Sequence, residues 1–233
     1  MIERRANLAT RLQRFRDCHR GERLVLVCNG PSLNQTDFSL IRSEVSMGLN
    51  KIFLGFRRLK FYPRYYLAIN PRVIEQSAQE IAQLNCVCFL KNMGNSNPLP
   101  ESALTYFLQP RPEERFHPDV CQGFFEGYTV TFAALQLAFF MGFSKVIIVG
   151  MDHRYSYTGL PNEPHVLKGR DPNHFDPSYF SGHTWDNPDL ANSERFYAMA
   201  RDAFEADGRR ILDCTDGGAC TVFEKGRLEE VLR

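Results

Sequence analysis

Short, continuous apolar runs recur along this chain at intervals that leave room for a helix between them. The first is LVLVC, and YYLAI, CVCFL and KVIIV follow later. Runs of this length, bounded by turn signals, are typical of strands buried on both faces, and such strands occur in parallel sheets. The runs predict strands at Leu24–Cys28, Val45–Leu49, Tyr65–Ile69, Cys86–Leu90, Lys145–Val149 and Arg210–Cys214.

Helical patterns lie between these runs. An amphipathic lead-in carries Leu8, Leu12 and Phe15 at helical spacing. The clearest helices are predicted at Val73–Leu84, Thr129–Met141 and Ser193–Asp207, with Gly142 and Gly208 where left-handed C-terminal caps belong. Strands that alternate with helices predict an α/β fold with a Rossmann-like, mostly parallel sheet flanked by helices. Such sheets bind ligands outside the carboxyl ends of their strands, so function is expected in the loops that follow them.

Two long segments interrupt the alternation, at 91–127 and at 153–191. Long connections in a compact domain are usually functional or disordered. The second segment is rich in aromatic residues and histidines, which is not typical of disorder. We therefore expect a lid insertion at about 153–191 over the site, within a single domain that spans residues 1–233.

Charge and composition exclude several classes of partner. The 233 residues include 28 Lys and Arg against 27 Asp and Glu, so a net charge of +1 offers no general attraction for nucleic acid. The start, MIERRANLATRLQRF, has no apolar run of the length of a signal peptide core, and no later stretch approaches the length of a membrane span. Seven cysteines, most of them in or beside strand-like runs, are typical of reduced thiols. We expect a cytoplasmic protein with at most peripheral membrane contact; the sequence leaves a homo-oligomer open.

Three asparagines stand at the ends of three successive predicted strands: Asn29, Asn50 and Asn70. An amide side chain both donates and accepts hydrogen bonds, which suits the edge of a base and the hydroxyls of a ribose. Asn29 opens a turn with Gly30, Pro31 and Ser32, which lacks the pattern of a Walker loop or of a dinucleotide fingerprint. An ordinary turn explains each asparagine separately, but their shared placement favours nucleotide binding.

The loop after the strand Lys145–Val149 carries further polar groups. Asp152 is placed to bind a ligand or, equally, to cap a turn. Arg154, Tyr155 and Tyr157 can donate hydrogen bonds to a departing phosphate, although surface exposure also explains the arginine. Farther on, His183 follows a glycine in the aromatic segment, and imidazole can act as a general base near neutral pH. Asp171, His174 and Asp176 could also hold a divalent metal ion, although their spacing matches no specific site.

Taken in order, these elements resemble the bacterial CMP-sialic acid-dependent sialyltransferases of the Campylobacter type. They are also similar to a broader bacterial family grouped with archaeal 6-hydroxymethyl-dihydropterin diphosphokinase. The resemblance rests on CNGPSL after the first strand, on Asn50 and Asn70, on the block Thr129–Asp152 and on FSGH ending at His183. It covers most of the chain, from about residue 24 to about residue 218.

The resemblance implies a function and roles for residues. Asn29, Asn50 and Asn70 would contact CMP, and His183 would be the base. Thr129 and Thr131 stand near the place where the sialyltransferases have an arginine and a serine, and we expect them to contact the nucleotide. The implied reaction transfers a sialic acid-like or Kdo-like sugar from a CMP-sugar to a glycan acceptor with inversion and without a metal cofactor.

Two other functions stay open at this point. A pterin diphosphokinase would use ATP and Mg²⁺ held by Asp152, Asp171 or Asp176. A nucleotide-binding module would bind without turnover. The basic and aromatic run Phe56–Tyr62 is compatible with an anionic acceptor or a membrane surface, and equally with a solvated helix face.

Overall fold

An eight-stranded, wholly parallel sheet forms the centre of the protein. The structure is a computed structural model that describes residues 2–233, and side chains from residue 8 onward. The strand order is β10-β9-β6-β1-β2-β3-β4-β5, and every neighbouring pair is parallel. The strands are β1 (Arg23–Val27), β2 (Ser46–Leu49), β3 (Tyr65–Ala68), β4 (Val87–Lys91), β5 (Thr105–Leu108), β6 (Lys145–Val149), β9 (Arg210–Asp213) and β10 (Glu224–Lys225).

The order of the strands creates a crevice beside β1. From β1 the chain adds β2 to β5 on one side and then returns to place β6 on the other side. Val27 at the end of β1 pairs with both Gly48 and Val149, so the three strands end within one residue of each other. Loops that leave such a reversal point diverge, which opens a ligand site at the carboxyl edge. The predicted α/β fold with a mostly parallel sheet is confirmed.

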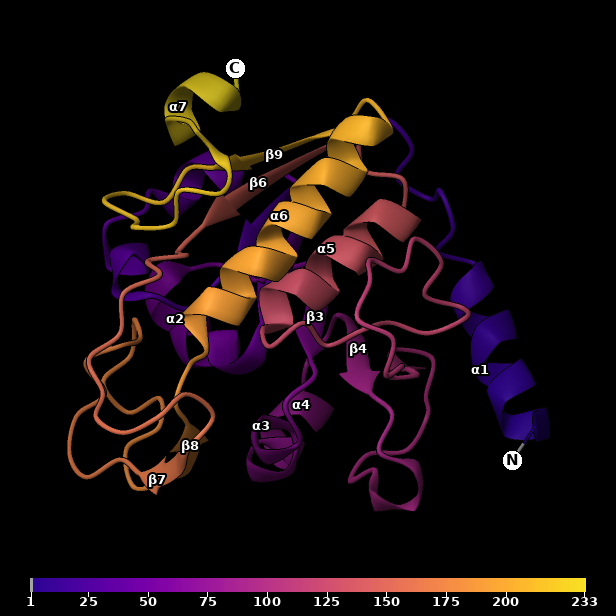
Figure 1. Cartoon of the computed structure of the whole chain (residues 1–233), viewed down its shortest axis with the longest axis horizontal. Coiled ribbons are helices and arrows are strands. Elements are labelled where there is room, and N and C mark those ends of the chain that lie inside the picture. The colour runs from indigo at the N-terminus through magenta and orange to yellow at the C-terminus, as the bar shows by residue number, and fades with distance from the viewer. Residues whose placement is uncertain (1) are drawn as a thin grey trace.

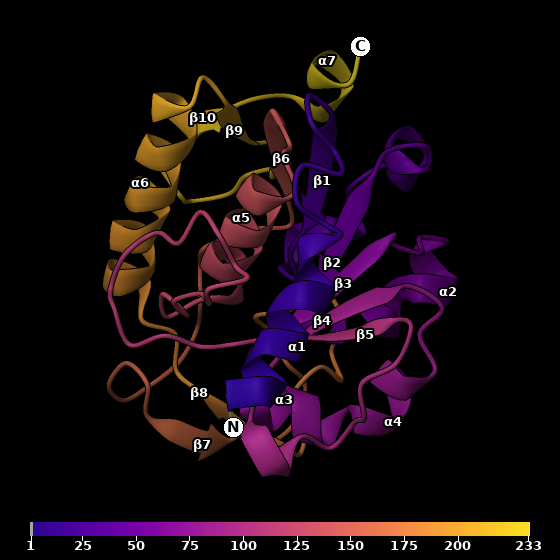
Figure 2. The same cartoon turned by 90° about the vertical axis from the view of Figure 1, so that its right-hand side faces the viewer.

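Helices cover both faces of this sheet, as Figure 2 shows from the side. α1, α5 and α6 contribute to one apolar core, and the short helices and the lid contribute to the other. α5 and α6 lie side by side across their face (Figure 1). The helices are α1 (Ile2–Gln13), α2 (Phe56–Leu59), α3 (Pro71–Gln76), α4 (Ala78–Ala82), α5 (Val130–Phe140), α6 (Leu190–Ala206) and α7 (Leu228–Val231), with 3-10 turns η1 (Pro31–Asn34), η2 (Phe38–Ile41), η3 (Asn50–Gly55) and η4 (Gly94–Ser96).

α5 is buried on nearly all sides, because the sheet lies beneath it, α6 lies beside it and the segment 91–127 packs against it. Its one buried amide, Gln136, accepts hydrogen bonds from the backbone N–H groups of His117 and Phe125 and donates to the carbonyl of Phe125. These bonds satisfy loop groups that would otherwise be buried without partners. They fix the end of segment 91–127, which also supplies the edge strand β5.

Several details differ from the sequence-based expectation, among them the short strands β7, β8 and β10, which were not predicted. The helix predicted at Val73–Leu84 is divided into α3 and α4 at Ser77, whose φ of −120° and ψ of 21° are not helical. The strand β5 was not predicted, because its residues TYFL stand inside a long proline-rich segment. The two glycine caps are as predicted, with φ of +88° at Gly142 and +70° at Gly208.

The segment at 153–191 folds over the carboxyl edge and packs on the face opposite α5. It contains an antiparallel hairpin of β7 (Pro164–Val166) and β8 (Thr184–Asp186), which lies near the start of α6 in Figure 1. Four of its aromatic side chains join the second core: Phe175, Tyr179, Phe180 and Trp185. We call residues 153–191 the lid. Within residues 2–233, no helix has both the length and the apolar character that crossing a membrane requires.

Candidate active site

Two adjoining cavities lie at the carboxyl edge, beneath the lid. The inner cavity, of about 90 Å³, is bounded by the loops after β1, β2 and β6 and by the start of α5. The outer cavity, of about 630 Å³, extends between the start of α3, the lid and the start of α6. Both are lined by Asn50, Thr129, Val130, His153, Tyr155, His174 and Tyr197. Together they have the size of a small-molecule site.

Two of the predicted asparagines present unpartnered acceptors at the inner cavity. Nδ2 of Asn29 donates to the carbonyl of Leu49 at 3.0 Å, which fixes the orientation of the amide. Its Oδ1, and Oδ1 of Asn50, are buried without a hydrogen-bond partner among the described residues. A buried acceptor without a partner is costly, and both residues line the inner cavity, so a ligand that donated hydrogen bonds to them would relieve that cost.

Asp152 joins the loops after β1 and β6. Its carboxylate accepts from the hydroxyl of Ser32 at 2.6 Å and from the Ser32 backbone N–H at 3.0 Å. A Cβ on Gly30 would lie 1.9 Å from Oδ2 of Asp152, so only glycine permits this approach. Pro31 begins η1 beside them. Ser32 and Asp152 therefore link the two loops through hydrogen bonds. Gly30 and Asp152 also line the inner cavity.

Asn70, Thr129 and Thr131 stand at helix starts. Oδ1 of Asn70 caps α3 by accepting from the N–H of Arg72, and Asn70 lines only the outer cavity. Thr129 caps α5 and lies 3.1 Å from the hydroxyl of Tyr197. Thr131 lies beside Cys28, whose pKa is raised by burial to about 12. That thiol therefore stays protonated and is not a nucleophile.

His174 lies on the wall of both cavities and is hydrogen-bonded to Asp171, which is buried behind it. Nδ1 of His174 donates to Oδ2 of Asp171 at 2.9 Å, and the imidazole stacks on Tyr179 with ring centroids 4.0 Å apart. Burial opposes the charge on Asp171, but the hydrogen bonds from His174 and from the backbone of Asn173 and Phe180 prevail and lower its pKa. An ionised Asp171 keeps the proton on Nδ1 and leaves Nε2 as an acceptor.

The other predicted residues of the lid are placed differently. His183 is exposed and lines neither cavity. Tyr157 donates its hydroxyl to the carbonyl of Pro188 at 3.3 Å, also outside both cavities. Arg154 and Tyr155 do line the inner cavity, and Arg154 forms no ion pair with a described residue. Desolvation raises the pKa of the Tyr155 phenol, which therefore remains a hydrogen-bond donor.

His153 lines both cavities and was missed in the sequence. It is 9% exposed, and its Nε2 lies 2.9 Å from Oε1 of Glu194 at the start of α6. The backbone of His153 is left-handed, with φ of +54°. No sequence pattern signals a histidine in this conformation. In the described chain, six residues other than glycine have positive φ, and four of them line these cavities: Asn50, Tyr128, His153 and Asn162. Backbone strain of this kind gathers at functional sites.

The residues suggested for a divalent metal do not form a set of three ligands among the described residues, although Asp171 and His174 are in contact. Asp171 accepts from His174 and from two backbone N–H groups, and Asp176 accepts from Ser178. Asp152 is engaged with Ser32. From residue 2 to residue 233, no group of three or more His, Cys, Asp or Glu side chains is arranged to hold a metal ion.

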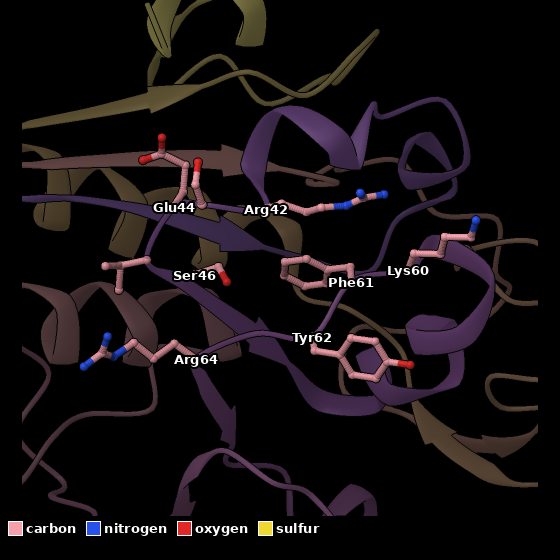
Figure 3. Close-up of a pocket in the computed structure, with 9 residues that line it drawn as sticks. Arg42, Glu44, Ser46, Lys60, Phe61, Tyr62 and Arg64 are labelled. Atoms are coloured by element: carbon pink, nitrogen blue, oxygen red, sulfur yellow. The ribbon is translucent and has the colours of Figure 1, made fainter.

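A separate hollow of about 530 Å³ lies at the opposite, amino-terminal edge of the sheet (Figure 3). Arg42 and Lys60 extend to one side of it and Arg64 to the other, so these cations do not converge. Glu44 is engaged with Arg23, with 2.6 Å between Nη2 and Oε1. The basic and aromatic run at 56–62 contributes to this hollow, which we leave unassigned. Polar side chains that face a shared cavity lie instead at the carboxyl edge.

Comparison with known proteins supports the fold. No protein-family model matches the chain, and no curated protein matches it in sequence. One solved structure that matches is the MAf glycosyltransferase from Magnetospirillum magneticum AMB-1, with a TM-score of 0.56 and 12% identity. The match covers 97% of this chain and 38% of that protein, so the chain spans well under half of its length. The chain shares a fold with part of a glycosyltransferase.

Proposed function

We propose that this protein is an inverting glycosyltransferase. It takes a sialic acid-like or Kdo-like sugar from a CMP-sugar and transfers it to a glycan acceptor. The observation that carries the proposal is the pair of unpartnered amide oxygens of Asn29 and Asn50 at the crevice beside β1. A histidine on the wall of the same cavities, hydrogen-bonded to a buried carboxylate, would supply the chemistry.

The donor side of the site suits a nucleotide. The amino group of cytosine and the hydroxyls of ribose donate hydrogen bonds, which the two amide oxygens accept. The start of α5 and the side chain of Arg154 provide N–H groups and positive charge for the phosphate. The choice of cytosine among the bases rests on the resemblance to sialyltransferases.

His174 is the general base in this proposal. Its Nε2 takes the proton of an acceptor hydroxyl while that oxygen forms a bond to the anomeric carbon. The bond from the anomeric carbon to the phosphate oxygen breaks on the opposite face, and CMP leaves with the electron pair. Asp171 keeps the imidazole oriented and stabilises the imidazolium that forms. His183, which the resemblance named as the base, is exposed outside the cavities and serves as the comparison residue.

The diphosphokinase alternative has no observation in its favour. It needs carboxylates free to hold Mg²⁺, and Asp152, Asp171 and Asp176 are each engaged by hydrogen bonds within the protein. We expect transfer from the CMP-sugar to proceed without added metal.

A thermal-shift panel tests the proposal. CMP, CDP, UDP, GDP and ATP are compared with and without Mg²⁺, because a ligand that binds only the folded state raises the melting temperature. We expect CMP or CDP to stabilise the protein without metal, and Asn50→Ala to remove most of the effect. Stabilisation only by ATP with Mg²⁺ would overturn the proposal in favour of diphosphate transfer. Binding of CMP without turnover of any CMP-sugar would indicate a binding module.

A further inference from the structure

His153 lies where the proposed function needs a second positive charge. It belongs to the loop that follows β6, directly before Arg154, and lines both cavities. Among the described residues at the inner cavity, Arg154 is the one arginine, and no lysine lines it. Three carboxylates stand close by, but Asp152 is held by Ser32 and Asp171 by His174. The third, Glu194, contacts His153 itself.

The contact between His153 and Glu194 determines what the imidazole can offer a ligand. An ionised carboxylate only accepts hydrogen bonds, so the N–H at Nε2 of His153 donates a hydrogen bond to Oε1 of Glu194, with 2.9 Å between the two atoms. Nδ1 has no hydrogen-bond partner among the described residues. A proton on Nδ1 would make His153 a cation that is paired on one side and a hydrogen-bond donor on the other. An anionic ligand atom stabilises that form.

The surroundings hold His153 in this arrangement. The side chain is 6% exposed, whereas that of Glu194 is 46% exposed, so the imidazole faces the cavity and its partner faces solvent. The φ of +54° at His153 is unfavourable for a histidine and is retained in spite of its cost. A residue that only filled space would not require this backbone conformation or a carboxylate partner on α6.

We propose that His153 is a phosphate-binding residue of this site and that Glu194 is its positioning residue. Together with Arg154, His153 binds the phosphate of the nucleotide and stabilises the charge that develops when the nucleotide leaves. This inference rests on the proposed function, which did not require His153. It predicts that replacing His153 or Glu194 weakens the binding of the phosphate group and leaves the binding of the base and ribose unchanged.

Calorimetric titration with matched nucleosides and nucleotides tests this. We compare four pairs: cytidine with CMP, uridine with UMP, guanosine with GMP, and adenosine with AMP. In each pair, the Kd of the nucleoside divided by the Kd of the nucleotide measures the benefit of the phosphate. We expect His153→Asn to reduce that ratio about tenfold to a hundredfold in the tightest pair. The nucleoside Kd should stay unchanged. Asparagine is chosen because it tolerates the left-handed backbone.

Glu194→Gln provides the second variant and His183→Asn the matched control. Glu194 is half-exposed on α6, so its replacement should leave folding intact, and we expect the ratio to fall at least severalfold. His183→Asn should leave it unchanged. An unchanged ratio in both His153→Asn and Glu194→Gln, or no wild-type preference for any nucleotide over its nucleoside, would overturn the inference. A response confined to a base other than cytosine would refute the proposed donor and leave the role of His153 standing.

Discussion

Two histidines of the lid lie close in sequence but in different surroundings, and this difference is the reason that we propose His174 as the base. His174 has 11% of its side chain exposed and is hydrogen-bonded to a carboxylate that is 1% exposed. His183 is exposed, and no side-chain partner fixes its ring among the described residues. A base must be held within reach of the proton that it removes, and of these two histidines His174 is the one that lines the cavities.

A pair of matched substitutions at these histidines tests this. His174→Gln should lower kcat about 10² to 10⁴-fold, because glutamine is polar and of similar size but cannot accept the proton. His183→Gln should change kcat less than about twofold by the same reasoning. CMP release from a CMP-sugar with a glycan acceptor measures both. The reverse pattern would restore His183 as the base and show that the lid rearranges when substrates bind.

At the scale of elements, Asp171 organises the turn of the lid that carries His174. It accepts from His174 and from the backbone N–H groups of Asn173 and Phe180. These bonds, opposed by burial, lower the pKa of Asp171 in the folded protein. A carboxylate with a lowered pKa stabilises the fold above its ordinary pKa, near 3.9, and this contribution is lost as the pH falls through the lowered value.

Asp171→Asn should therefore destabilise the protein in a pH-dependent way. We expect a loss of about 1 to 3 kcal/mol in the free energy of unfolding at pH 6. The difference from wild type should shrink as the pH falls below about 4. Urea unfolding at several pH values measures it. Asp176→Asn, which affects only a hydrogen-bonded turn with Ser178, is the control. A penalty for Asp171→Asn that is constant from pH 3 to pH 7 would contradict the role of its charge.

The sequence predicted the elements well where hydrophobic pattern alone decides them. The run KVIIV predicted β6 from Lys145 to Val149, to the residue. The pattern failed where a single residue redirects the backbone. Ser77 divides a continuous helical pattern, and β5 becomes a strand because it can pair with β4 at the sheet edge. Neither event leaves a periodic signal, since tertiary contacts override local preference.

The site was predictable in its location and less so in its contacts. Parallel strands bring their ends together, and this places Asn29 and Asn50 at one cavity. The sequence did not distinguish a ligand contact from a helix cap at Asn70. It identified His174 only as a possible metal ligand, because its pairing with Asp171 depends on how the lid turns. His153 was missed because a left-handed backbone is not visible in composition or spacing.

At the scale of the whole molecule, the cavities have walls from both the sheet edge and the lid. Loops after β1, β2 and β6 provide one wall, and His174, Phe180 and Trp185 belong to the other. A bound nucleotide should therefore slow hydrogen exchange in two regions that are distant in sequence. At a concentration 100 times its Kd, the added protection can reach about 2.7 kcal/mol.

Mass spectrometry after exchange, with and without CMP, measures this protection. We expect slower exchange at residues 28–32, 49–52 and 150–155 and, in parallel, at 171–187. Residues 42–46 and 60–64, at the opposite edge, provide an internal control within the same molecule. Protection of the sheet loops alone would mean that the lid does not close on the nucleotide.

The division of the cavity walls has a consequence for how such a chain can diversify. The groups proposed for the nucleotide stand mainly on loops of the sheet, whereas much of the outer wall comes from one uninterrupted stretch of about forty residues. Recombination could exchange that stretch for another without disturbing the order of the strands. A chimera whose foreign lid keeps His153, Arg154, Asp171 and His174 would then retain its nucleotide and its base and acquire a new acceptor, so that exchange of one segment alters the product.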